Sequence, residues 1–172
     1  MHPRSLAPRA LAALAALVAV VIAASATGCG QDDDPEGARI LWDKVNAGAG
    51  FASWQRAPGY GVRRASFTAH ATAVEIFVSP EVTATLAPPV TRTAPVTEWP
   101  IGSIVVKEGF SSVSGGSRKS IAIMEKQKDG WFWAEYDDSG TSTYSGHPSV
   151  CLDCHTHRKS YSDWVYSFEL PR

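Results

Sequence analysis

The feature that most constrains the fold is a group of three β-type segments in the second half of the chain. They cover residues 103–110, 120–126 and 131–137 and are rich in β-branched and aromatic residues. The links between them, residues 111–119 and 127–130, are short and contain glycine. Parallel neighbours would need a crossover connection of about a dozen residues or more, so these strands are predicted to run antiparallel. The sequence thus predicts an α+β fold with a mainly antiparallel β-sheet.

A few short helices and further strands are predicted around this sheet. A helix over residues 36–47 has Asp34 as its capping residue and Pro35 at its start, and Gly48 stops it. The other expected elements are a strand at 74–78, a brief helix ending at Leu86, a proline-rich loop at 87–100, a short helix at 149–158 and a last strand at 164–170.

The first 28 residues have the pattern of a secretory signal peptide. Basic residues near the start precede an unbroken apolar run at 10–24, which is 15 residues long. A membrane-spanning helix needs about 20 apolar residues, so a cleaved signal is expected instead. The acidic segment that follows, residues 29–37, is predicted to be a solvated tether. Residues 38–172 are then the folded domain.

Small residues precede Cys29, as in the lipobox of bacterial lipoproteins. Lipid attachment to Cys29 would place the protein on the periplasmic side of a bacterial membrane. Gly30, where inner-membrane lipoproteins carry aspartate, favours the outer membrane. The alternative is ordinary signal cleavage after Ala26, which would leave Cys29 without a lipid.

The overall composition is that of a globular protein. Charged residues make up 19% of the chain and hydrophobic residues 44%, which excludes a disordered or collagen-like chain. The formal net charge is −1. Because a nucleic-acid-binding domain should show a basic stripe, nucleic acid is not an expected partner.

The strongest functional motif is 151–155, Cys-Leu-Asp-Cys-His, which has the C-x-x-C-H pattern of c-type haem attachment. Both thiols must reach the vinyl groups on one porphyrin edge, and the adjacent histidine must ligate the iron. Positions i, i+3 and i+4 share one face of a helical turn, which meets both needs. Such haems are attached outside the bacterial cytoplasm, in agreement with the export signal. The sequence predicts one covalent haem c held by Cys151 and Cys154 in a C-terminal attachment segment, with His155 as the iron ligand.

Other uses of these side chains are open. A redox C-x-x-C pair or a structural disulfide would also suit an exported protein, although neither needs the histidine. A zinc site made of Cys151, Cys154, His155 and His157 is a further alternative. Four ligands within seven residues cannot easily surround one ion, so haem attachment is the preferred interpretation.

The second axial position of the iron is predicted to be open or filled by water. Only 17 residues follow His155 and none is methionine, so the usual His/Met arrangement is missing. Met124, His70 and His147 remain as alternative sixth ligands, whereas His157 lies too close to His155 to cross the ring. An open iron favours small-molecule binding or redox catalysis over simple electron relay.

Aromatic residues are frequent in the segment 131–136. Trp131, Phe132, Trp133 and Tyr136 could wall a flat apolar cofactor. Equally, they could fill the core of the sheet, because sheets select aromatic residues.

The order of these motifs resembles the cytochrome P-460 family, which includes the beta-type cytochromes c′. The resemblance covers roughly residues 38–170. The segments that carry it are 74–80 (Val-Glu-Ile-Phe-Val-Ser-Pro), 99–108 (Trp-Pro-Ile-Gly-Ser-Ile-Val-Val-Lys-Glu), 130–136 (Gly-Trp-Phe-Trp-Ala-Glu-Tyr) and the C-x-x-C-H motif followed by 163–166 (Asp-Trp-Val-Tyr).

The resemblance implies an α+β fold, a homodimer and a five-coordinate haem c. In true P-460 proteins a lysine is bonded to the porphyrin, and by motif match this lysine is Lys107. Lys107 is predicted to share a strand face with Val105, and a buried lysine is costly unless it is neutral or bonded. The alternative is a solvated lysine beside Glu108. The resemblance also implies an acidic residue near the open side of the iron, and the candidates are Glu75, Glu98, Glu108 and Glu135.

These observations predict a lipid-anchored periplasmic haem c cytochrome. Its expected activity is oxidation of hydroxylamine or handling of nitric oxide, with electrons passed to an external acceptor. The alternatives are a non-enzymatic cytochrome that binds or senses a gas, and an electron-transfer module with a sixth protein ligand.

Overall fold

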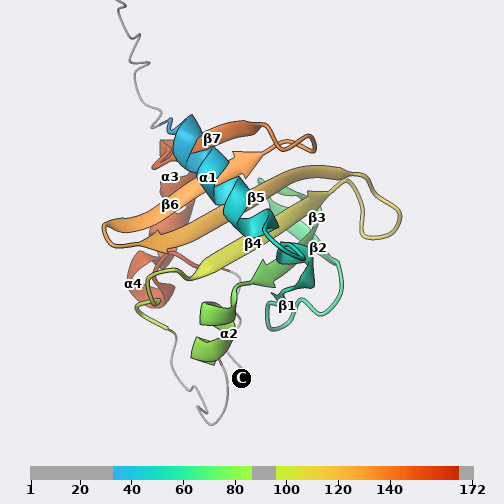
Figure 1. The fold of residues 1–172 in the computed structure, drawn as a ribbon. Coiled ribbons are helices and arrows are strands. Elements are labelled where there is room, and N and C mark those ends of the chain that lie inside the picture. The colour runs from blue at the N-terminus through green and yellow to red at the C-terminus, as the bar shows by residue number, and fades with distance from the viewer. Residues whose placement is uncertain (1–32, 87–95, 167–172) are drawn as a thin grey trace, which may run out of the picture.

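The computed structural model describes residues 33–86 and 96–166, and these fold around one antiparallel sheet (Figure 1). The strand order is β1-β3-β4-β5-β6-β7, and β2 pairs with β3. The strands are β1 Gln55–Arg56, β2 Arg64–Thr68, β3 Ala71–Val78, β4 Ile104–Phe110, β5 Arg118–Gln127, β6 Gly130–Tyr136 and β7 Ser142–Gly146. The helices are α1 Pro35–Asn46, α2 Pro80–Leu86, α3 Ser149–His155 and α4 Lys159–Ser162, with 3-10 turns at Phe51–Ser53 and Thr156–Arg158.

The predicted α+β class and antiparallel sheet are confirmed. The three central segments form β4, β5 and β6, each paired antiparallel with the next. The expected helix at 36–47 is α1, in which the Asp34 side chain accepts a hydrogen bond from the Gly37 amide. Because α1 begins at Pro35, the folded domain starts inside the segment assigned to the tether.

Several expectations at the two ends of the chain have other outcomes. The prediction of a last strand at 164–170 is wrong for residues 164–166, which form a turn and an irregular segment. Residues 167–170 of that strand, the signal peptide at 1–28, Cys29 and most of the proline-rich loop lie outside the described residues. Within the described residues, no helix is both long and apolar enough to span a bilayer.

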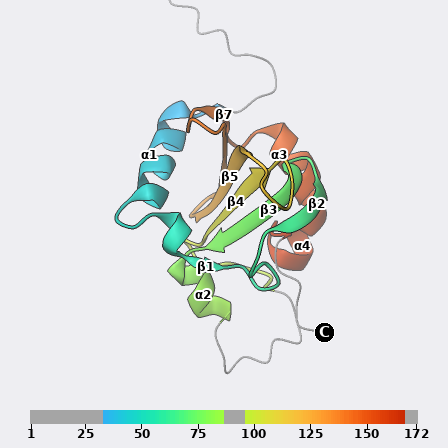
Figure 2. The ribbon, with the colours of Figure 1, turned by 90° about the vertical axis from the view of Figure 1, so that its right-hand side faces the viewer.

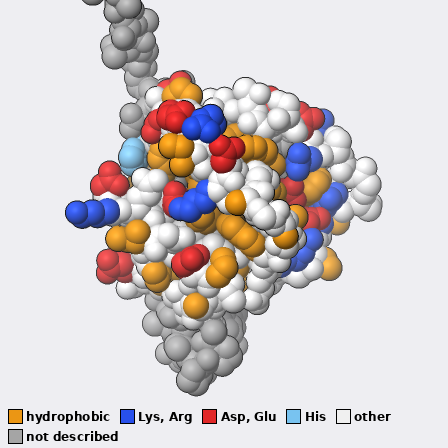
Figure 3. All heavy atoms as spheres, in the orientation of Figure 1, with side chains coloured by type: hydrophobic (Ala, Val, Ile, Leu, Met, Phe, Trp, Pro, Cys, Tyr) orange, Lys and Arg blue, Asp and Glu red, His pale blue; other side chains and the backbone are white. Residues whose placement is uncertain are grey.

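The two faces of the sheet are covered by different elements. In Figure 2 the sheet is seen nearly edge-on, with α1 on one side and α3 and α4 on the other. Alternation along each strand divides the apolar residues between these faces. Leu41 and Val45 of α1 pack with Val106 and Ile123 in one buried cluster. On the surface around α1, acidic and basic side chains are interspersed (Figure 3).

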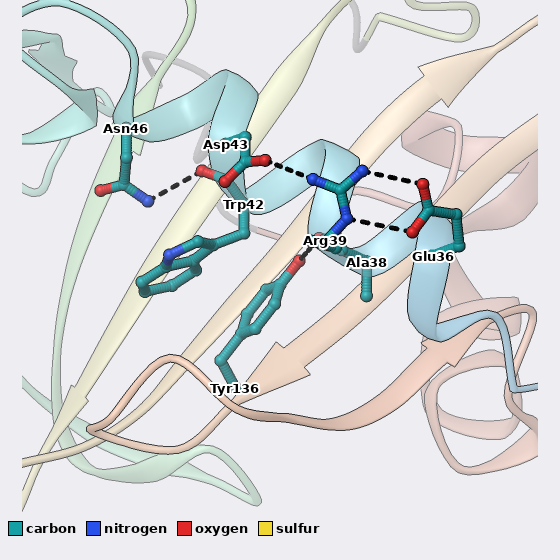
Figure 4. Close-up of polar contacts among 7 residues, drawn as sticks. All are labelled: Glu36, Ala38, Arg39, Trp42, Asp43, Asn46 and Tyr136. Atoms are coloured by element: carbon teal, nitrogen blue, oxygen red, sulfur yellow. Dashed lines mark hydrogen bonds and ion pairs between the residues drawn. The ribbon is translucent and has the colours of Figure 1, made fainter.

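Tyr136 ties α1 to the sheet. It is 1% exposed, and its hydroxyl donates a 2.7 Å hydrogen bond to the carbonyl of Ala38 (Figure 4). Its ring lies 4.7 Å from that of Trp42, measured between centroids. Burial raises the pKa of the Tyr136 phenol, so the hydroxyl remains a donor over the working pH range.

We expect Tyr136→Phe to lower the free energy of unfolding by about 1–3 kcal/mol, because the Ala38 carbonyl loses a buried donor while the ring packing is kept. Urea titration of the two proteins measures the difference. Tyr161→Phe is the matched control, since the Tyr161 side chain is 51% exposed. Equal losses in both variants would contradict a special role for the buried hydroxyl.

Candidate functional site

A cavity of about 280 Å³ lies on the face of the sheet opposite α1. Its floor consists of two rows of side chains that run across β4, β5 and β6. Lys107, Ala122 and Glu135 are register partners in one row, and Val105, Met124 and Trp133 are partners in the other. Helix α3 and the β2–β3 turn complete the walls. The lining residues from these two elements are Ala69, His70, Val150, Cys151, Cys154 and His155.

The structure brings the whole C-x-x-C-H motif to this cavity. Cys151, Cys154 and His155 lie on one side of α3, as their spacing predicts, and all three line the cavity. Both cysteines are free thiols. Burial is the main reason why the pKa of Cys151 is raised to about 12, and the nearby Glu135 carboxylate adds to the effect. The Cys151 thiol is therefore protonated, unlike the low-pKa thiolate of a redox C-x-x-C pair.

The zinc alternative also lacks a site. Among residues 33–86 and 96–166, no three His, Cys, Asp or Glu side chains are grouped so that they could hold a metal ion. His157 is exposed and does not line the cavity, in contrast to its neighbour His155.

His155 is oriented by a hydrogen bond to the backbone. Its Nδ1 lies 2.7 Å from the carbonyl oxygen of Trp164. A carbonyl can only accept, so Nδ1 carries the proton and Nε2 keeps its lone pair. Burial, followed by the charges of Lys107 and His70, lowers the pKa of His155 to about 4 against the opposing effect of the Trp164 carbonyl. The imidazole is thus neutral at pH 7, as an iron ligand requires.

Two aromatic rings fix the plane of the His155 imidazole. The Trp133 ring lies 4.5 Å from it and the Tyr166 ring 5.1 Å from it, both edge-on. The Tyr166 hydroxyl also donates to the carbonyl of Cys154 at 2.9 Å. The side chain that the sequence assigns to the iron therefore has a defined orientation before any ligand is bound.

Lys107 lies on the inward face of β4, as predicted, and lines the cavity with Val105. Its register partners are Ile76 on β3 and Ala122 on β5. Burial lowers the pKa of Lys107 to about 8, although the negative charge of Glu135 opposes this shift. The amine is consequently easier to deprotonate than that of an ordinary lysine, although its charged form still predominates at pH 7.

We expect Lys107→Met to stabilise the haem-free chain at pH 7 by on the order of 1 kcal/mol. The folded-state pKa of Lys107 is about 8, whereas an unfolded lysine has a pKa of about 10.4. Between these two pKa values the unfolded chain therefore binds more protons than the folded chain. The free energy of unfolding of the wild type should consequently rise with pH over that range, relative to that of the variant. Urea titrations at pH 7 and pH 10 measure this change. Lys119→Met, at an exposed position, is the control. If the wild type and Lys107→Met differed by the same free energy of unfolding at both pH values, the burial of a charged amine would be contradicted.

The four acidic candidates differ in their position relative to the cavity, and Glu135 is the one that the geometry favours. Of the four candidates it alone lines the cavity. Glu75 forms ion pairs with two arginines, Glu108 pairs with Arg118, and Glu98 is exposed. His70 Nδ1 lies 3.2 Å from Glu135 Oε2, so the carboxylate has a hydrogen-bonded partner at the cavity wall. The cross-strand register that places Glu135 beside Ala122 and Lys107 could have identified it.

The aromatic segment is divided between the two faces. Trp133 lines the cavity, whereas Phe132 and Tyr136 belong to the core under α1, so for these two residues the alternative of sheet core holds. Trp131 is buried in the second core cluster without lining the cavity. Strand alternation explains this split.

Two of the three alternative sixth ligands lie at the cavity. His70 and Met124 both line the cavity, whereas His147 is exposed and does not. The His70 and His155 rings are 6.4 Å apart between centroids.

The cavity fits a large, mostly apolar group with polar edges. Val105, Ala122 and Met124 supply apolar walls. The Trp133 indole is 4% exposed, and its Nε1–H has no hydrogen-bond partner. A buried donor without an acceptor is costly, and a bound group with carboxylate edges would remove that cost. Together with the free Nε2 of His155, these features suit a porphyrin.

The comparison with known protein families agrees with this chemistry. The family model for cytochrome P460 matches residues 59–167, which is more than half of the chain and includes β2 to α4. No curated protein matches the chain. The matched segment holds Lys107, Glu135 and the complete C-x-x-C-H motif, so the chain belongs to the cytochrome P460 family, whose cofactor is haem.

Proposed function

We propose that this protein is an exported haem c cytochrome that oxidises hydroxylamine at an open iron position. The observation that carries the proposal is the composition of the cavity. One space contains the C-x-x-C-H motif, the buried amine of Lys107 and the hydrogen-bonded pair Glu135–His70. A site that only relays electrons does not need Lys107, Glu135 or His70 beside the iron.

Covalent attachment of haem would use both thiols of α3. Each S–H would add across a vinyl group, with a new C–S bond and the hydrogen transferred to the neighbouring carbon. The addition needs no oxidant, but it needs reduced cysteines, and Cys151 and Cys154 are free thiols. Nε2 of His155 would hold the iron from the same helix.

The cavity side chains supply the proton chemistry. A bound haem would supply the redox chemistry, by which electrons could pass from the substrate to an external acceptor. Oxidation of hydroxylamine releases protons together with electrons, so a base must stand beside the substrate. Glu135 is the base that we assign, with His70 holding one of its oxygens. The family resemblance implies a bond from Lys107 to the porphyrin. Forming it would replace one N–H and one porphyrin C–H by a C–N bond, with two protons released and two electrons passed to an external oxidant. The neutral form of the amine, which the lowered pKa of Lys107 makes more accessible, would supply the lone pair.

Absorption spectra of the purified full-length protein, taken with and without hydroxylamine, test this proposal. We expect a strongly red-shifted ferrous Soret band, because a bond from Lys107 would perturb the porphyrin. Lys107→Ala should shift this band to that of an ordinary high-spin haem c, and Lys119→Ala should leave it in place. An unchanged spectrum in Lys107→Ala would show that no such bond exists. A spectrum without any response to hydroxylamine would exclude the proposed substrate.

A second candidate is reversible binding of nitric oxide without turnover. The apolar floor formed by Val105, Ala122 and Met124 favours it, since such walls exclude water from a bound gas. In that case nitric oxide titration would give a saturable spectral change, and hydroxylamine would not reduce the iron. A low-spin, six-coordinate spectrum would instead identify His70 or Met124 as a sixth ligand and an electron-transfer role.

Export and lipid attachment complete the proposal. The leader at 1–28 and the haem motif both indicate the periplasm, and Cys29 is the residue that would carry the lipid. We propose the outer membrane as the site of attachment, with residues 29–34 connecting the lipid to α1.

A further inference from the structure

Two consecutive residues after α4 adopt a backbone conformation that favours glycine. Asp163 has φ 46° and Trp164 has φ 71°, and they are the only non-glycine residues with positive φ in the described chain. Such conformations persist only where surrounding contacts hold them, and they are enriched at functional sites. This turn therefore needs an anchor.

The anchor is a partly buried ion pair between this turn and the sheet. The Nζ of Lys126 on β5 donates to both carboxylate oxygens of Asp163, at 2.8 and 3.1 Å. The two side chains are 15% and 10% exposed. The Trp99 amide donates to the same carboxylate at 2.9 Å, and the Trp99 indole donates to the Ser162 carbonyl at 3.2 Å.

The anchored turn ends at the group that orients the candidate iron ligand. The carbonyl of Trp164, the residue after Asp163, accepts the 2.7 Å hydrogen bond from His155 Nδ1. On β5, Met124 and Lys126 are two residues apart and so project from the same face, with Met124 in the cavity floor. The sheet that forms the cavity is thus linked, through Lys126 and Asp163, to the residue that carries this carbonyl.

We propose that the Lys126–Asp163 ion pair is a positioning device for His155, which sets the orientation and basicity of its Nε2 by holding the Trp164 carbonyl in place. This inference rests on the proposed ligation of haem iron by His155. Partners that accept a hydrogen bond from a ligating histidine raise the basicity of the ligand, and they affect metal affinity and activity. Neither Lys126 nor Asp163 lines the cavity, so both act through another residue.

The direction in which the reduction potential changes distinguishes a positioning role of the ion pair from a direct electrostatic effect of the Lys126 charge on the iron. A strong hydrogen bond from Nδ1 makes the imidazole a better electron donor, which stabilises ferric iron and lowers the potential. Releasing the Trp164 carbonyl should therefore raise the potential. Loss of the positive charge of Lys126 acts in the opposite direction, because ferric iron would then be less repelled. In Lys126→Met the reduction potential should therefore rise if the ion pair positions His155, and fall if only the charge of Lys126 matters.

The experiment uses the full-length holoprotein. Its reduction potential is measured by spectroelectrochemical titration, and the iron–histidine stretching frequency of the ferrous form by resonance Raman spectroscopy. For Lys126→Met we expect a higher potential and a lower stretching frequency than in the wild type. Lys128→Met is the matched control, because Lys128 is an exposed lysine in the β5–β6 turn; both of its values should equal those of the wild type.

A lower or unchanged potential in Lys126→Met would overturn the proposal. If that variant does not fold, Asp163→Asn replaces it, since asparagine tolerates positive φ and can still accept from the Trp99 amide. A lower stretching frequency in Asp163→Asn supports positioning, and a wild-type frequency overturns it. A wild-type protein without attached haem would instead contradict the proposed function, and this result would be known before any variant is compared.

Discussion

Replacing Cys151 and Cys154 by serine will abolish covalent attachment of haem. Serine hydroxyls do not add to vinyl groups under the conditions in which thiols do, and the described chain has no other cysteine near the cavity. The intact polypeptide of the wild type should carry the added mass of one haem, which acidified organic solvent cannot extract. The double variant should have the mass of the polypeptide alone.

The single variants and a control make this test specific. Cys151→Ser and Cys154→Ser should each keep one thioether, and therefore keep haem on the polypeptide in lower yield. Cys29→Ser makes the same substitution at the first residue of the predicted tether and should prevent lipid attachment without removing haem. Covalent haem in the double variant would contradict the assignment of both thiols.

Replacing Glu135 by glutamine will lower the rate of hydroxylamine oxidation by about 10²–10⁴-fold, the usual contribution of a positioned general base. Glutamine keeps the size of the side chain and an oxygen that can accept from His70, but it cannot take up a proton. Steady-state turnover with an artificial electron acceptor measures the loss. The haem spectrum should remain that of the wild type, because Glu135 does not attach the cofactor.

The control for this prediction is Glu98→Gln. Glu98 is exposed and outside the cavity, so its variant should turn over at the wild-type rate. Retained activity in Glu135→Gln would mean that the base lies elsewhere. A loss that is accompanied by a changed spectrum would assign Glu135 to the structure of the site and not to proton transfer.

The main sheet was predictable because its central strands have strong local patterns. Residues 103–137 carry β-branched and aromatic runs separated by short glycine-bearing links, and these became β4, β5 and β6. Strand β7 was missed because its sequence, Ser-Thr-Tyr-Ser-Gly, has no apolar run. Its pairing with β6 defines it, and such pairing is not a local property of the sequence.

A local pattern was also misleading near the C-terminus. The residues after Asp163 have the composition of a strand, and a strand was predicted from Trp164 onward. In the structure the ion pair with Lys126 holds Asp163 and Trp164 in a left-handed turn. This turn is accompanied by a contact 37 residues away in sequence, which no local pattern encodes.

The candidate site was predictable only in part, for a related reason. The C-x-x-C-H motif is contiguous, and Lys107 could be matched within a recognisable run. Glu135 could not be separated from three other glutamates, because its position depends on the register of two strand pairs. Shifting either register by one residue would have moved its side chain to the α1 face.

The separation of the two faces has a consequence for maturation. The core under α1 contains no residue from the motif-bearing helix, and it is already closed by Leu41, Val45 and Tyr136. The core on the α1 face can consequently form before haem is bound. Haem attachment would then take place on a preassembled scaffold, on which Cys154 is accessible to solvent.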